Sequence, residues 1–266
     1  MLNHKIEGHG PPLLMIHGLG ISFPIWGGLR PYLCDHFTLI MVELPGIGSS
    51  PPPGPAIGYL AAALDGIEEL RISLDVERWH VLSYSSGTRI AEQYVRRHAP
   101  QVERAVFLCP ARVRATSAAA LRLALWTDGR YPSVGNRMLS GATLRFLIRL
   151  LAFNMRTDAL AGEWLDRITC QPVATLKETL RAMPAGGAAE FHLPPEVSSL
   201  FIWGREDLIT ATPRVPSERD LIVPGAHSTV QKFPAASAAG IVNFLSARDG
   251  LAASFSPVQD AALHAA

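Results

Sequence analysis

The stretch VLSYSSGTRIAEQY, residues 81–94, joins an apolar run to a helix-like run through a knot of small residues. Ser83 and Gly87 lie two residues before and two residues after Ser85. A serine at the tip of a tight strand-to-helix turn has strained backbone angles, and small residues at those two places let the strand and helix backbones pass closely. The pattern therefore predicts that the turn exposes the Ser85 hydroxyl as a nucleophile. A tight turn built from small polar residues, with no catalytic role, is the alternative.

Strand-like and helix-like runs alternate on both sides of this stretch. Six short runs are strand-like; they lie at residues 11–18, 37–44, 78–85, 102–110, 197–204 and 219–225. The first two are apolar and are ended by glycine or proline, which is typical of strands buried on both faces. Helical runs separate them, with apolar residues every three or four positions between Ile57 and Leu70 and again from Ile90 to Val95. The alternation predicts an α/β fold with a mostly parallel central sheet flanked by helices.

The pattern changes between residues 112 and 195, where the runs are helical and no convincing strand appears. Residues 120–126, 144–155 and 176–183 are the clearest of these helical runs. We therefore expect a core domain made of residues 1–111 and 196–247, with residues 112–195 inserted as a helical cap or lid. Residues 248–266 are rich in alanine and serine and are expected to form a flexible tail.

Composition excludes several classes of function. The 266 residues are 48% hydrophobic and 18% charged, with a formal net charge of +1, which gives no global field to attract nucleic acid. The first ten residues are polar, and no apolar run reaches about 18 residues, so neither a leader peptide nor stable membrane insertion is expected. We expect a cytoplasmic protein whose partner is a small-molecule substrate, and homodimer formation stays open.

Motifs for metals and cofactors are missing from the sequence. Cys34, Cys109 and Cys170 are odd in number and lack metal-ligand spacing, so we expect buried reduced thiols. The G-x-G fragments at residues 18–20 and 46–48 do not continue to a third glycine that opens a helix, which disfavours a dinucleotide site. The sequence therefore predicts neither a metal nor a cofactor.

Four further stretches, together with residues 81–94, resemble the α/β-hydrolase family over residues 5–247; they are LLMIHGLG (13–20), VELPGIGSS (42–50), FIWGREDLI (201–209) and VPGAHS (223–228). The resemblance implies an α/β-hydrolase fold in which Ser85 is the nucleophile, Asp207 the acid and His227 the base of a catalytic triad. It also implies that the backbone N–H groups of Leu19 and Ser86 form the oxyanion hole. Two residues depart from the family pattern: Ser83 replaces the usual glycine, and Glu43 replaces the commoner aspartate.

These residue types suit the chemistry of acyl transfer. A neutral serine hydroxyl becomes a good nucleophile only when a base takes its proton, and an imidazole does so near neutral pH. An aspartate fixes the histidine tautomer, and N–H donors hold the developing oxyanion. We expect His17 to be a hydrogen-bonded structural histidine, and Asp207 rather than its neighbour Glu206 to be the acid.

The inserted helices suggest the substrate class, because they carry more apolar than polar surface; the residues are Leu123, Leu125, Trp126, Leu147, Leu151, Phe153 and Trp164. Most of them must pack the insertion onto the core domain. We expect a serine esterase or thioesterase that cleaves a small-to-medium hydrophobic carboxylic ester or thioester through an acyl-enzyme. Tyr84 and Trp126 are candidate substrate-binding residues.

Arg89 supports a second hypothesis. The run YSSGTRIA, residues 84–91, is similar to a stretch of the menaquinone-pathway lyases, which lose pyruvate. In those lyases the arginine binds substrate carboxylates and the serine acts as a base, so the resemblance implies a substrate-binding role for Arg89. A third hypothesis is a catalytically idle ligand-binding protein on the same fold.

Overall fold

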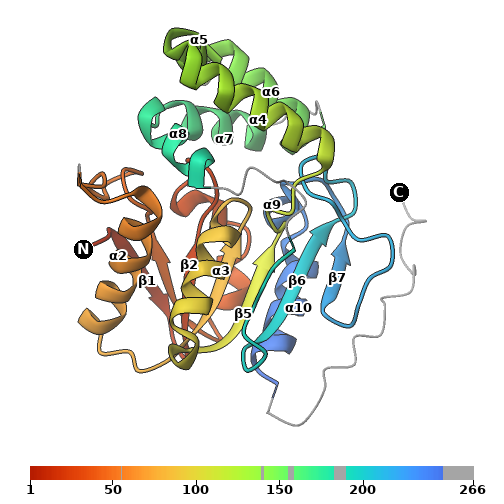
Figure 1. The fold of residues 1–266 in the computed structure, drawn as a ribbon. Helices are drawn as coiled ribbons and strands as arrows, with labels where there is room; N and C mark the ends of the chain where they lie inside the picture. Colours follow the sequence, from red (N-terminus) through yellow and green to blue (C-terminus); the bar gives the residue numbers. More distant parts are fainter. Residues whose placement is uncertain (55, 139–140, 155–158, 183–189, 248–266) are drawn as a thin grey trace.

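The computed structural model describes residues 1–54, 56–138, 141–154, 159–182 and 190–247 (Figure 1). Its centre is a seven-stranded sheet with strand order β1-β3-β2-β4-β5-β6-β7. The strands are β1 His4–Gly8, β2 Pro12–Ile16, β3 Thr38–Val42, β4 Trp79–Tyr84, β5 Val102–Leu108, β6 Ser198–Gly204 and β7 Asp220–Val223. β1 pairs antiparallel with β3, and the other pairs are parallel. The α/β class, the mostly parallel sheet and the six predicted strands are therefore confirmed.

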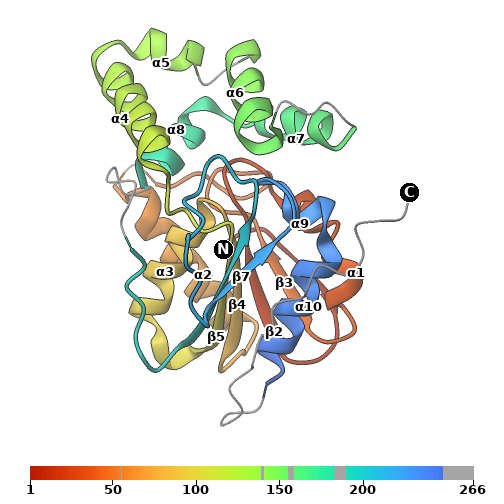
Figure 2. The ribbon, with the colours of Figure 1, turned by 90° about the vertical axis from the view of Figure 1, so that its right-hand side faces the viewer.

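Helices cover both faces of the sheet. Figure 2 shows α2 Tyr59–Ser73 and α3 Gly87–Arg97 on one face, with α1 Arg30–Leu33 and α10 Pro234–Leu245 on the other. The shorter elements are η1 Phe23–Trp26, η2 Ala99–Gln101 and α9 Thr229–Lys232. The predicted apolar stripe is correct from Leu60 to Leu70, whereas Ile57 precedes α2 and is 50% exposed.

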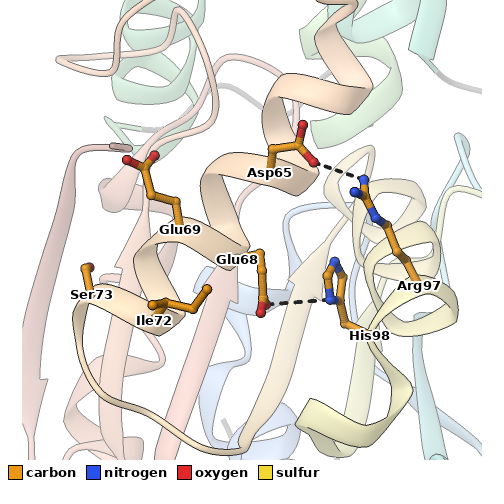
Figure 3. A pocket seen from close by; sticks show the side chains of 7 residues that line it. All are labelled: Asp65, Glu68, Glu69, Ile72, Ser73, Arg97 and His98. Carbon is orange, nitrogen blue, oxygen red and sulfur yellow. Dashed lines mark hydrogen bonds and ion pairs between the residues drawn. The ribbon is translucent and has the colours of Figure 1, made fainter.

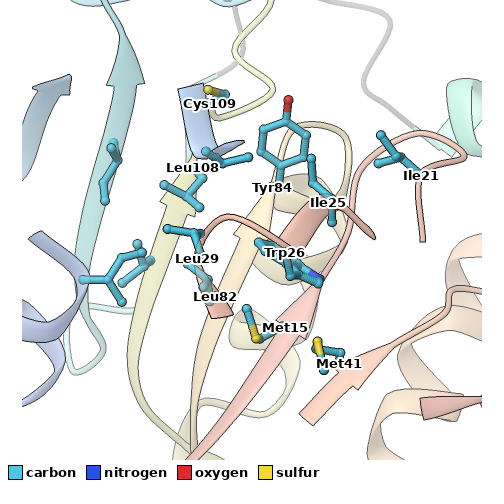
Figure 4. Packing of buried hydrophobic residues seen from close by; sticks show 14 of the residues in the cluster. Met15, Ile21, Ile25, Trp26, Leu29, Met41, Leu82, Tyr84, Leu108 and Cys109 are labelled. Carbon is cyan, nitrogen blue, oxygen red and sulfur yellow. The ribbon is translucent and has the colours of Figure 1, made fainter. Parts of the chain in front are cut away.

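Two hydrophobic clusters form the core, one on each face of the sheet. Figure 4 shows part of the first, in which Trp26 and Leu29 pack over Met15, Leu82 and Leu108. Strands of a parallel sheet that is covered on both sides are apolar at nearly every position, so their side chains fill both clusters. This packing fixes the carboxyl ends of the central strands, where the predicted site residues lie.

The inserted segment consists of helices that lie beyond the carboxyl ends of the strands (Figure 1). They are α4 Ala115–Arg130, α5 Pro132–Met138, α6 Gly141–Phe153, α7 Ala159–Thr169 and α8 Val173–Ala182. The three helical runs predicted from the sequence fall mainly within α4, α6 and α8. The domain boundaries stay a prediction, and the expected tail, 248–266, lies outside the described residues.

Two smaller findings concern expectations from composition. No helix in the described part of the chain combines the length and the apolar character needed to cross a bilayer. All three cysteines are free thiols, but only Cys109 is buried. Cys34 is half-buried and Cys170 is exposed at the end of α7, so the expectation of three buried thiols is wrong.

Candidate active site

The turn between β4 and α3 holds Ser85 in a left-handed backbone conformation, with φ of +52°. Its N–H donates to the Leu108 carbonyl at 3.0 Å, and its own carbonyl accepts from the Thr88 N–H at 2.9 Å. A Cβ on Gly87 would overlap the His17 carbonyl, so the position admits only glycine without a shift of backbone. The small residue at position 87 is thereby explained: the backbone of Ile16 and His17, which leads into the predicted oxyanion loop at Gly18–Gly20, passes directly against the turn.

A continuous line of contacts joins the serine to the predicted base and acid. His227 Nε2 lies 2.7 Å from Ser85 Oγ, and His227 Nδ1 lies 2.8 Å from Asp207 Oδ2. An ionised carboxylate only accepts hydrogen bonds, so Nδ1 carries the proton and Nε2 is left to accept from the serine hydroxyl. Asp207 follows β6 and His227 follows β7, so two adjacent strand ends bring them to the turn after β4.

Asp207 is fully buried and accepts four hydrogen bonds. Its Oδ1 accepts from the N–H groups of Ile209 at 2.8 Å and Thr210 at 3.1 Å, and its Oδ2 accepts from Thr210 Oγ1 at 2.7 Å and from His227. Burial alone would raise the pKa of Asp207, but the His227 imidazole and these hydrogen bonds outweigh it and lower the pKa. The carboxylate therefore stays ionised beside His227. The neighbouring Glu206 does not take this place.

The predicted oxyanion-hole donors are available. Within the part of the chain that the structure describes, the N–H groups of Leu19 and Ser86 have no hydrogen-bond acceptor. His17 ties the loop that carries Leu19 to the segment that follows β3. Its Nδ1 lies 2.7 Å from the Gly18 carbonyl, and its Nε2 accepts from the Leu44 N–H at 3.0 Å. Burial lowers the pKa of His17 to about 4, so it is neutral and fits the predicted structural role.

Glu43, the replacement for the commoner aspartate, is buried and ties three segments together. Its carboxylate accepts from Asn3 Nδ2 at 2.7 Å, from the Ser49 N–H at 2.7 Å and from Ser22 Oγ. Ser22 belongs to the loop that follows Leu19. Glu43 thus joins the start of the chain and the turn after β3 to the oxyanion loop.

Tyr84 and Cys109 both lie near His227, although the sequence indicated neither as a support for it. Tyr84 is buried beneath the predicted triad and donates through its hydroxyl to the His227 carbonyl at 2.7 Å, so it supports His227 from below. Cys109, which no motif singled out, has a φ of +42° and directs Sγ at the same carbonyl, 3.6 Å away. Figure 4 shows both side chains at the same end of the sheet. Only their place at strand ends beside Ser85 could have indicated this.

Cys109 also completes a group of potential metal ligands. Its Sγ and the ligand atoms of Asp207 and His227 lie within 4.8 Å of one another. Burial and the charge of Asp207 raise the pKa of the Cys109 thiol well above its usual value, so it stays protonated. Because four donors already occupy Asp207, hydrogen bonding accounts for this arrangement.

The other predicted substrate-binding residues lie elsewhere. Arg89 is buried on α3, where it pairs with Glu92 at 2.8 Å and donates to the Ala111 carbonyl at 3.0 Å. Its guanidinium also lies 4.1 Å from the centre of the Phe191 ring. Trp126 is 65% exposed on α4. The structure therefore gathers Ser85, Asp207, His227, Leu19 and Ser86, together with Tyr84, at one point and leaves Arg89 and Trp126 in other surroundings.

A separate surface cavity of about 520 Å³ lies between α2 and α3. Figure 3 shows the side chains that line it, with Arg97 bonded to Asp65 and His98 close to Glu68. Four of the lining side chains form these two pairs, and the cavity lies apart from the turn that carries Ser85. We assign it no part in the chemistry.

Comparison with known proteins gives concordant results. A family model described as alpha/beta hydrolase fold matches residues 11–214. An uncharacterized protein of Mycobacterium tuberculosis is 34% identical over 104 residues, which are 39% of this chain and only 30% of that protein. A pimeloyl-[acyl-carrier protein] methyl ester esterase of Aeromonas hydrophila is 23% identical over 79% of this chain and 82% of its own. The structure of a thermophilic esterase from Thermogutta terrifontis superimposes with a TM-score of 0.71 at 17% identity, covering 92% of this chain and 93% of that one.

Proposed function

The chain belongs to the alpha/beta hydrolase fold family of enzymes, and on that premise we propose that it is a serine esterase or thioesterase that works through an acyl-enzyme. The observation that carries the proposal is the unbroken line of hydrogen bonds from Ser85 through His227 to Asp207. A protein that only bound its ligand would have no use for a buried carboxylate aligned with an imidazole and a strained serine.

In the proposed first step, Ser85 Oγ attacks the carbonyl carbon of the ester while His227 Nε2 takes the hydroxyl proton. Asp207 keeps the imidazole in the required tautomer and stabilises the imidazolium. The N–H groups of Leu19 and Ser86 hold the oxyanion, and a donor of this kind typically contributes on the order of 3 kcal/mol to the transition state. His227 then returns the proton to the leaving alcohol or thiol, and the acyl group stays on Ser85.

In the second step, water attacks the acyl carbonyl and His227 takes one of its protons. The oxyanion forms in the same place and is held by the same two N–H groups. Collapse of the tetrahedral intermediate releases the carboxylic acid and restores the Ser85 hydroxyl. Each proton that leaves an attacking oxygen is thus given by the same nitrogen to the leaving oxygen, or to the leaving sulfur of a thioester.

The surroundings of the oxyanion loop support a hydrophobic acyl group. Side chains of Leu176 and Ile168, from α8 and α7, approach Gly20 next to Leu19, where a Cβ would meet Leu176 at 2.8 Å. The ring of Trp164 on α7 packs edge-on against Tyr84, with centroids 6.1 Å apart. Apolar side chains therefore lie beside the proposed oxyanion hole, and a small-to-medium acyl chain suits them better than a charged one.

Labelling with a fluorophosphonate, followed by mass mapping of peptides, tests the proposal. We expect one modified peptide that contains Ser85, and no label in Ser85→Ala. Nitrophenyl esters of graded acyl length then report turnover and the preferred chain. An unlabelled but folded parent protein would contradict the proposal and favour the ligand-binding alternative.

The lyase hypothesis gains no support from the surroundings of Arg89, because its guanidinium is occupied by Glu92, Ala111 and Phe191. Turnover of an acidic diene substrate with negligible turnover of neutral esters would restore that hypothesis.

A further inference from the structure

We propose that the buried Arg89–Glu92 pair on α3 is a clamp that holds both ends of the inserted helical segment against the turn that carries Ser85. We further propose that the clamp sets which acyl chains the enzyme accepts, and this second part rests on the proposed esterase function. Arg89 and Glu92 are therefore positioning residues in this proposal and touch no reacting atom.

The pair lies on the first two turns of α3, directly after Ser85. The side chains of Arg89 and Glu92 are only 6% and 4% exposed, and Nη1 lies 2.8 Å from Oε2. Burying charged side chains is costly, and they are seldom buried unless they are paired and hydrogen-bonded. A buried charge pair at this place therefore indicates a structural role. Its remaining contacts supply one, because they go to both ends of the insertion.

The first contact is with the end at which the chain leaves the sheet. Arg89 Nε donates to the Ala111 carbonyl at 3.0 Å, and the Ala111 N–H donates to Thr88 Oγ1 at 2.9 Å. The Thr88 hydroxyl in turn donates to the Ser85 carbonyl at 2.5 Å. The backbone of Ala111, just before α4, is thereby bound to the serine turn on both its donor and its acceptor side.

The second contact is with the end at which the chain returns. Glu92 Oε1 accepts from the His192 N–H at 2.8 Å, and the Arg89 guanidinium lies 4.1 Å from the centre of the Phe191 ring. The Phe191 ring also packs against Phe107 of β5, with centroids 5.2 Å apart. Residues about eighty positions apart in the sequence are thus held by one pair of side chains.

The consequence concerns the helices between these ends. α7 and α8 contact the oxyanion loop at Gly20, so a shift of the ends changes the space beside Ser85 without changing the triad itself. A variant that weakens the clamp should therefore alter the choice among acyl chains more than the chemical step.

Hydrogen exchange measured by mass spectrometry tests the clamp without any substrate. The variants are Arg89→Lys, which keeps a cation but loses the Nε donor to the Ala111 carbonyl, and Glu92→Gln, which keeps the shape of the side chain but loses the charge that pairs with Arg89 and strengthens the bond from the His192 N–H. We expect exchange to quicken by roughly tenfold or more in peptides covering both 111–114 and 190–193. The matched control is Arg97→Ala, which removes an exposed ion pair with Asp65 from the same helix and should change neither peptide. Faster exchange at one end only, or at neither, would overturn the clamp.

Kinetics with short and long nitrophenyl esters test the second part. In Arg89→Lys we expect the ratio of kcat/KM for long over short esters to change by about threefold or more, mainly through KM, while kcat for the short ester stays within about twofold. If hydrogen exchange is faster but the kcat/KM ratio is unchanged, the clamp is supported, and the proposal that it sets which acyl chains are accepted is overturned. If the parent protein hydrolyses no ester, the proposed function fails, and the exchange result still decides the clamp. Should Glu92→Gln not fold, Arg89→Lys alone carries both measurements.

Discussion

At the scale of single residues, Ser83 shows how the turn tolerates a departure from glycine. Its side chain is fully buried, and its hydroxyl donates to the Val106 carbonyl on the neighbouring strand at 3.2 Å. A hydroxyl buried without a partner would destabilise the strand, but this one has an acceptor. Serine is therefore accommodated two residues before Ser85, although the sequence pattern alone could not show how.

The triad residues should act as a unit. We expect Ser85→Ala and His227→Ala each to lower kcat for a nitrophenyl ester by about a thousandfold or more, and the double variant to be hardly slower than either single one. The reason is that the hydroxyl and the imidazole serve a single proton transfer. Steady-state rates of the three variants check this, and multiplicative losses would contradict it.

The two neighbouring acidic residues should behave differently. Asp207→Asn should lower kcat by at least about a hundredfold, because an amide nitrogen beside Nδ1 favours the wrong tautomer of His227. Glu206→Gln is the matched control and should stay within about twofold. Equal losses in the two variants would place the acid elsewhere.

At the scale of elements, the close crossing of α3 and the oxyanion loop depends on Gly87. In Gly87→Ala the new Cβ would overlap the His17 carbonyl and lie 2.9 Å from the Ile16 carbonyl, both of which are backbone atoms that cannot turn aside. We expect a loss of about 2 kcal/mol or more in the free energy of unfolding, measured with denaturant. Gly54→Ala, where no atom of the described residues other than the chain neighbours lies within 4 Å of the new Cβ, should change it by less than about 0.5 kcal/mol.

The elements that sequence patterns predicted are those with a single clear signal. The six predicted strands are rich in apolar residues, and all but the edge strand β7 are largely buried, so their existence follows from hydrophobicity. β1 was missed because its residues are polar and half-exposed, as is usual for an edge strand with one paired side. Ile57 was wrongly included in α2 because spacing does not show where a helix begins, and Gly58 is the residue that precedes it.

At the scale of the whole molecule, two buried histidines link stability to pH. Burial lowers the pKa of both His17 and His80 from 6.5 to about 4, and for His80 the nearby Arg104 and Arg78 add to the effect. Between pH 6.5 and about pH 4, each of these two histidines binds a proton in the unfolded chain but not in the native protein. Stability is therefore full above pH 6.5 and falls as the pH drops toward 4.

The expected slope is at most about 1.4 kcal/mol per pH unit for each histidine. His80→Gln should remove one such contribution, so its free energy of unfolding should depend less steeply on pH than that of the parent protein. Denaturant titrations at several pH values between about 4 and 6.5 measure both slopes. Parallel curves for the parent and the variant would contradict the assignment of His80.

The candidate site was predictable where each residue has its own local motif. Ser85, Asp207 and His227 each follow a strand, and parallel strand ends meet at one edge, so their convergence followed from topology. The support from Tyr84 and Cys109, and the diversion of Arg89 to Glu92 and Phe191, depend on contacts between distant segments. No local pattern specifies such contacts, and Arg89 accordingly suggested a substrate ligand when read beside Ser85 alone.

The two ends of the inserted segment lie close together, and this affects how the sequence of the segment can change during evolution. Since the chain leaves at Ala111 and comes back at Glu190 against the same helix, the segment between them can be lengthened, trimmed or exchanged without shifting a strand. The groups proposed to break bonds are encoded outside that segment, and many of those proposed to meet the acyl chain are encoded inside it. Mutation can thus alter the substrate specificity of the enzyme and its chemistry separately. A chimera that carries a relative's helices between these two points should acquire that relative's substrate preference and keep the proposed triad of this chain.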